Sequence, residues 1–108
     1  MTILFKYATR SRPDKFQEGL DSIQRNLSQP DKCSVLVSID NDDRTMDKYR
    51  MFSNVISGTS ANKIEAINRG LRYHPDDFIW NILICMSDDM RFITKGFDDI
   101  IRKDMAEH

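Results

Sequence analysis

WNILICM (residues 80–86), followed at once by SDDM (residues 87–90), is the stretch from which we infer the fold. Its continuous apolar centre predicts a strand that is covered on both faces, as in a parallel sheet. Two acidic residues directly after such a strand lie where its carboxyl end meets solvent. We therefore predict a buried central strand whose end carries Asp88 and Asp89.

Strands and helices alternate along the rest of the chain. Apolar, β-prone runs predict strands at residues 2–8, 33–40 and 53–56. Apolar residues spaced three and four apart predict helices at residues 13–28, 61–73 and 95–105, and the polar run at 41–50 predicts a loop with a short helix. This alternation indicates an α/β fold with a mostly parallel sheet.

The bulk composition narrows the classes of function. The 108 residues fit one domain, residues 1–108, and 16 basic against 17 acidic residues give no support to general nucleic-acid binding. No segment approaches the roughly 20 apolar residues of a transmembrane helix. The first ten residues do not read as a signal peptide, so we expect a cytoplasmic protein. Cys33 and Cys85 lie in apolar runs, and the spacing between them does not fit a zinc site. We therefore predict that both are buried free thiols.

Ligands of parallel α/β sheets bind beyond the carboxyl ends of the strands, so the residues there are the candidates for function. Thr9, Arg10 and Arg12 follow the first strand and precede a helix that starts at a proline. The forked guanidinium group of arginine and the free N–H groups of a helix start both bind phosphate well. A solvated turn explains the same residues equally well. Asp40 ends the second strand, where a carboxylate can accept hydrogen bonds from a nucleobase or a ribose.

The acidic pair after the apolar strand is the sharpest signal. Adjacent carboxylates repel each other unless a cation or hydrogen-bond donors offset their charge. Mg²⁺ and Mn²⁺ take few carboxylates and share their remaining positions with phosphate oxygens and water. Asp88 and Asp89 therefore suit a metal that grips a diphosphate, and a solvated acidic turn is the alternative of equal weight. Lys63, near a helix start, could reach a phosphate or sugar, although surface lysines are more often simply solvated.

Four stretches in order carry a resemblance to a known family. They are ATRSRP (8–13), VLVSIDNDD (35–43), SANKIEAINRGL (60–71) and ICMSDDM (84–90). Together they resemble the N-terminal half of family-2-like GT-A glycosyltransferases, over residues 3–99. The acidic pair after an apolar strand is the strongest member, although Ser87 stands where many relatives have a first acid.

The resemblance implies a Rossmann-like, three-layer α/β/α sandwich. It also implies an enzyme that transfers a sugar from a nucleoside-diphosphate donor, with UDP-sugars favoured, to an acceptor. The site residues that it implies are Thr9, Arg10 and Arg12 at the nucleotide, Asp40 at a base that is often uracil, Lys63 at donor groups, Asp88 near the sugar or ribose, and Asp89 on Mn²⁺ or Mg²⁺. The acceptor is unknown.

Family members are much longer, and their later half binds the acceptor and supplies the catalytic base. The chain is therefore expected to be a truncated donor-binding portion, a natural short relative or a donor-binding remnant of such an enzyme, and no catalytic residue is assigned. Apolar surface left exposed where a second half would dock favours a homodimer.

Two other functions remain open at this stage. The chain could be a non-catalytic module that holds nucleotide-sugar, or a subunit that needs a partner. It could also be a receiver-like signalling domain, but that class places an acidic pair after the first strand, where this chain has arginine and serine.

Overall fold

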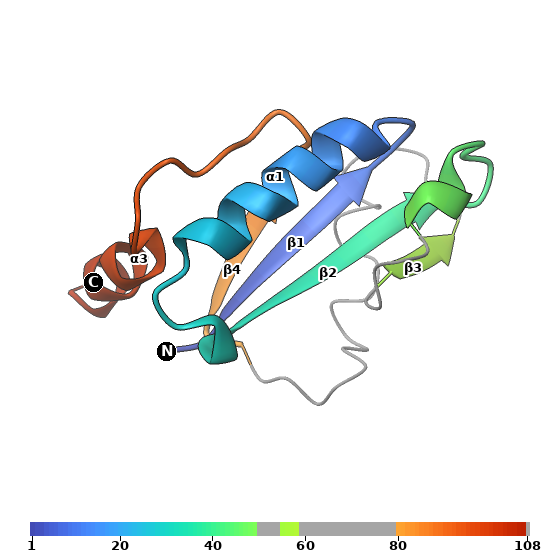
Figure 1. The fold of residues 1–108 in the computed structure, drawn as a ribbon. Coiled ribbons are helices and arrows are strands. Elements are labelled where there is room, and N and C mark those ends of the chain that lie inside the picture. Colours follow the sequence, from blue (N-terminus) through green and yellow to red (C-terminus); the bar gives the residue numbers. More distant parts are fainter. Residues whose placement is uncertain (50–54, 59–79, 108) are drawn as a thin grey trace.

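The computed structural model describes residues 1–49, 55–58 and 80–107. Within these ranges strands and helices alternate along the chain (Figure 1). In order, the elements are β1 (Ile3–Thr9), α1 (Pro13–Asn26), the 3-10 helix η1 (Pro30–Lys32), β2 (Cys33–Asp40), the 3-10 helix η2 (Met46–Tyr49), β3 (Val55–Gly58), β4 (Ile82–Met86) and α3 (Phe97–Ala106). The predicted α/β class is confirmed.

Most predicted bounds lie close to the observed ones. β2 begins and ends as predicted, and the short helix expected in residues 41–50 is η2. α1 ends two residues early because Leu27 is extended, with ψ at 135°. β3 lies two residues beyond the predicted strand at 53–56. The predicted helix at 61–73, and Lys63 with it, falls outside the described residues.

The strands form one sheet in the order β3-β2-β1-β4, and every neighbouring pair is parallel. Ile3 of β1 is level with Cys33 of β2 and with Ile82 of β4. These three strands therefore start together, and their carboxyl ends lie along one edge of the sheet. The expected parallel sheet is confirmed.

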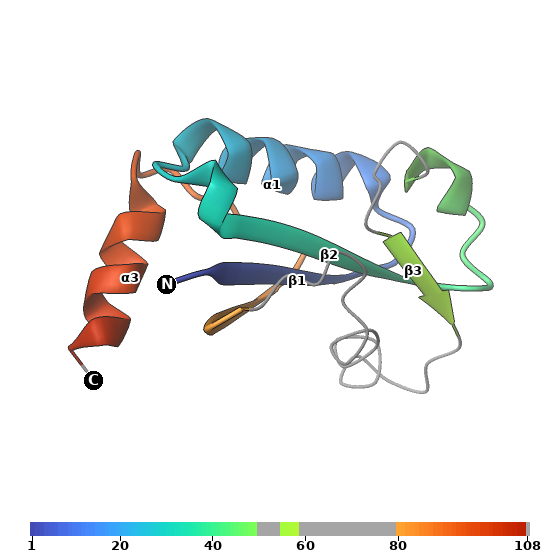
Figure 2. The ribbon, with the colours of Figure 1, turned by 90° about the horizontal axis from the view of Figure 1, so that it is seen from below.

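α1 covers one face of the sheet (Figure 2). Its apolar positions fall four and three apart, so Phe16, Leu20 and Ile23 share a face and are all buried. They pack in one core with Phe5 and Tyr7 of β1, and Tyr7 and Phe16 meet edge to face with ring centroids 5.0 Å apart. This contact holds the first turns of α1 close to the end of β1.

β1, and not β4, is the buried central strand. Alternate residues of β1 point to opposite faces, and Leu4 and Lys6 are as buried as Phe5. The prediction for residues 80–86 was wrong, because β4 lies at the edge of the sheet that the described residues form. An edge strand is covered less well, and Cys85 is exposed.

Both cysteines are free, as predicted, but neither is a buried thiol. Cys33 is partly exposed at the start of β2, and Cys85 is exposed on β4. The apolar run around Cys85 therefore indicates a strand without indicating its burial.

α3 lies beside the end of the sheet where β1 and β2 begin (Figures 1 and 2). The Arg102 guanidinium donates to the Met1 carbonyl at 2.7 Å and to the Asp98 carboxylate at 2.7 Å. Asp98 also accepts the backbone N–H groups of Ser28 and Gln29, at 2.7 and 3.0 Å. α3 is thereby anchored at the opposite end of the sheet from the acidic pair.

Among residues 1–49, 55–58 and 80–107, no helix has the length and apolar character needed to cross a membrane.

Candidate functional site at the carboxyl ends of the strands

The strand order reverses beside β1. From β1 the chain adds β2 and then β3 on one side, and it later returns to add β4 on the other side. The point where the order reverses therefore lies between β1 and β4, and ligands of such sheets bind beyond the strand ends at this point. Thr9 ends β1 there, and Ser87 and Asp88 follow β4.

A chain of hydrogen bonds crosses this point. The Thr9 hydroxyl donates to the Asp88 carboxylate at 2.8 Å, and the Tyr49 hydroxyl lies 3.0 Å from the same Thr9 oxygen. Because the single Thr9 proton goes to Asp88, Tyr49 must be the donor to Thr9. The backbone N–H of Arg12 in turn donates to Tyr49 at 3.3 Å. β1, β4, η2 and the start of α1 are joined by these four groups.

Burial strengthens this chain. Thr9 is 4% and Asp88 7% exposed, and Tyr49 is buried beside them. Desolvation raises the pKa of Tyr49. Tyr49 therefore keeps its proton at neutral pH and stays a donor. Tyr49 was not among the predicted site residues, since nothing in the run DKYR marks a tyrosine that folds back onto Thr9.

The Arg10 side chain joins the ends of β1 and β2. Its guanidinium donates to Asp40 at 2.9 Å and to both carboxylate oxygens of Asp42, at 2.6 and 3.1 Å. The hydrogen bond from Arg10 lowers the pKa of Asp42. Because Arg10 and Asp42 are largely exposed, water and salt screen these pairs, and they contribute little to stability. They do place Asp40 and Arg10 at one edge, as the sequence suggested.

Asp43 organises the two loops that follow β1 and β2. Its carboxylate accepts the Ser11 backbone N–H at 2.8 Å and the backbone N–H and hydroxyl of Thr45 at 2.8 and 2.6 Å. Burial acts to raise the pKa of Asp43, but the bonds from Thr45 and Ser11 outweigh it and lower the pKa overall. These bonds hold Ser11 in the left-handed region, with φ at 55°. The sequence indicated only a loop residue here.

Asp88 and Asp89 face different surroundings. The Asp88 carboxylate is buried against Thr9, whereas the Asp89 side chain is 75% exposed and lies 3.5 Å from the Arg12 guanidinium. Donors of the protein thus offset part of both charges, so repulsion between the two acids does not by itself require a metal.

The donor set limits which metal the site suits. Among the described residues, no group of three or more His, Cys, Asp and Glu side chains could hold a metal ion. A cage made wholly of protein ligands does not fit these residues. One or two carboxylates completed by phosphate oxygens and water, as Mg²⁺ and Mn²⁺ accept, do fit.

Of the seven site residues that the sequence suggested, six lie in the described residues. They fall into three contacts: Thr9 with Asp88, Arg12 with Asp89, and Arg10 with Asp40. Each contact joins the end of β1 to another loop at the same edge of the sheet.

Comparisons with protein-family models, with curated proteins and with solved structures found no match to this chain. The geometry of the strand ends and the four sequence stretches are therefore what supports a function.

Proposed function

We propose that the chain binds a nucleoside-diphosphate sugar, with a UDP-sugar favoured, at the carboxyl ends of β1, β2 and β4, in a fold of the GT-A type. The observation that carries the proposal is the Thr9–Asp88 hydrogen bond at the point where the strand order reverses. A buried acid and hydroxyl at this point, with two arginines beside them, supply acceptors for hydroxyl groups and cations for phosphates.

The residues divide by chemistry into two groups. Arg12 lies at the start of α1, where its guanidinium and the free N–H groups of the first turn suit a diphosphate. Asp40 and Asp88 can accept hydrogen bonds from ligand N–H and hydroxyl groups. Arg10, which now spans Asp40 and Asp42, can release one of these exposed pairs to meet the ligand at small cost.

Asp89 is the residue that would hold Mg²⁺ or Mn²⁺, through its exposed carboxylate. When bound, such an ion neutralises charge on a diphosphate leaving group. Asp89 lies beside Arg12, so a cation and a guanidinium would act on the same phosphates.

The reaction proposed is transfer of the sugar to an acceptor. Transfer needs a base that deprotonates the acceptor hydroxyl. Asp98 and Asp99, the next acids in the sequence after Asp89, do not provide this base. Asp98 is bound by Arg102 and two backbone N–H groups at the start of the sheet, and Asp99 contacts the same arginine. This placement favours a second candidate, a donor-binding module that does not catalyse transfer.

The strand order argues against the receiver-like alternative. Flavodoxin-like sheets, to which receiver domains belong, place the third strand beside the first. Here β3 pairs with β2, and β4 takes the place beside β1.

Calorimetry with UDP and UDP-sugars, with and without Mn²⁺, tests the proposal. We expect binding that depends on Mn²⁺ and that Asp89→Asn weakens by about tenfold or more, equivalent to roughly 1.4 kcal/mol. Asp104→Asn makes the same change of charge on α3, far from the site, and should leave the affinity unchanged. Equal affinity of wild type and Asp89→Asn would overturn the metal assignment. Hydrolysis of the bound donor then separates a transferase from a binding module.

A further inference from the structure

The segment that follows β4 runs alongside α1 (Figure 1). Glu18, Ser22 and Asn26 recur every four residues, so they form one polar stripe along this helix. The Ser22 hydroxyl accepts the backbone N–H of Phe92 at 3.1 Å, and the Asn26 amide donates to the Phe92 carbonyl at 2.9 Å. Two members of the stripe therefore hold the chain just beyond the acidic pair.

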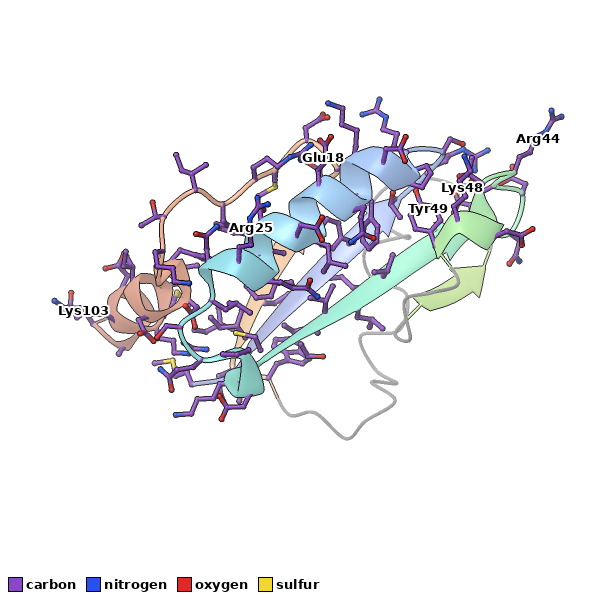
Figure 3. The ribbon with its side chains drawn as sticks, viewed as in Figure 1. Glu18, Arg25, Arg44, Lys48, Tyr49 and Lys103 are labelled. Atoms are coloured by element: carbon purple, nitrogen blue, oxygen red, sulfur yellow. The ribbon has the colours of Figure 1, made fainter. Side chains whose placement is uncertain are left out.

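Arg91 connects the third member of the stripe to the acidic turn itself. One guanidinium nitrogen donates to the carbonyl oxygens of Asp88 and Met90, at 2.8 and 3.0 Å. A second guanidinium nitrogen donates to the carboxylate of Glu18. Glu18 lies on α1 and is labelled in Figure 3. One planar side chain thus ties the turn to the helix, and its fork geometry is what lysine lacks.

Gly19 brings the turn and the helix into direct contact. A Cβ atom at this position would lie 3.0 Å from the Tyr7 hydroxyl oxygen and 3.1 Å from the Met90 carbonyl oxygen. The turn therefore packs closely on the backbone of α1, and a side chain at Gly19 would require Tyr7 or Met90 to shift. Burial, with a smaller effect of the Asp88 charge, raises the pKa of Tyr7 to about 12.

We infer that Arg91 is a positioning residue for the acidic pair, acting through the backbone of the turn. Its bond to the Asp88 carbonyl fixes the residue whose side chain must reach Thr9. Its bond to the Met90 carbonyl fixes the residue that follows Asp89. The inference rests on the proposed function, because it assigns Arg91 to the geometry of that same site without contact with the ligand.

Amide hydrogen exchange tests the positioning with no ligand present. The Met90 N–H donates to the Ser87 carbonyl at 3.1 Å and so reports whether the turn is closed. In Arg91→Ala we expect this amide to exchange about tenfold faster or more, with the amides of β1 unchanged. Arg44→Ala is the matched control, because Arg44 is exposed and points away from α1 and the sheet (Figure 3). Unchanged exchange at Met90 would overturn the inference.

Affinity separates positioning from a merely structural role. We expect Arg91→Ala and Arg91→Lys each to weaken binding of UDP with Mn²⁺ by about tenfold. Glu18→Gln keeps the guanidinium on both carbonyls and should change affinity less than about threefold. Faster exchange with unchanged affinity would refute the positioning role. If the wild-type protein binds no UDP, the proposed function fails, and the exchange experiment still decides whether Arg91 closes the turn.

Discussion

The hydroxyl group of Thr9 links the residues of the strand-end site. That hydroxyl donates to Asp88 and accepts from Tyr49, so three elements distant in sequence depend on it. Sequence reasoning identified Thr9 and Asp88 separately, from their positions after two strands. It could not pair them, because the pairing depends on β4 lying beside β1.

Replacing Thr9 with valine keeps the shape of the side chain and removes the hydroxyl. The buried Asp88 carboxylate then loses a donor and Tyr49 loses an acceptor, which should lower the free energy of unfolding by about 1–3 kcal/mol. Urea denaturation measures this difference. Thr94→Val is the control, because Thr94 is exposed and the same change there should have little effect. Equal losses in the two variants would show that the hydrogen-bond chain contributes nothing.

At the scale of elements, helix α3 depends on a buried ion pair. The Asp98 side chain is fully buried, and Arg102 is nearly so. Burial acts to raise the pKa of Asp98, but hydrogen bonds from Ser28, Arg102 and Gln29 outweigh it and lower the pKa. The amphipathic spacing predicted this helix, whereas the two anchoring residues could not be recognised without knowing which loop they meet.

Acid should release this anchor. Because the folded pKa of Asp98 lies below its unfolded value of about 3.9, its contribution is full above that pH and is lost as pH falls through the folded pKa. We expect Asp98→Asn to lower the free energy of unfolding at pH 7 by about 3 kcal/mol, since it leaves Arg102 with a weaker partner. Urea denaturation between pH 7 and pH 2 should also show a flatter pH dependence than in wild type. Asp104→Asn, an exposed change on the same helix, should keep the wild-type profile.

For the whole molecule, the sequence predicted the elements better than their arrangement. Periodicity and β-propensity are local properties, so β1, β2, α1 and α3 were predicted close to their observed bounds. Which strands lie side by side in a sheet is not a local property of the sequence. The apolar run before Asp88 therefore predicted a central strand, although β4 lies at the edge of the described sheet. The different surroundings of the two acids also depend on this arrangement, since Asp88 is buried against Thr9 and Asp89 is exposed beside Arg12.

The strand order predicts where the fold is most stable. β1 pairs with β2 on one side and β4 on the other and is buried on both faces. Its amides should therefore exchange only by global unfolding and be the slowest in the described part of the chain. Hydrogen exchange followed by NMR measures this order. Amides of α3 that outlast those of β1 would contradict it.

The anchor at Asp98 and the contact at Thr9 lie at opposite ends of β1, a strand of seven residues that spans roughly 20 Å. Substitutions that share no partner at such a separation have additive effects on stability. The end where the strands begin is accordingly where this protein can be engineered for thermal tolerance, with the proposed binding end left unaltered.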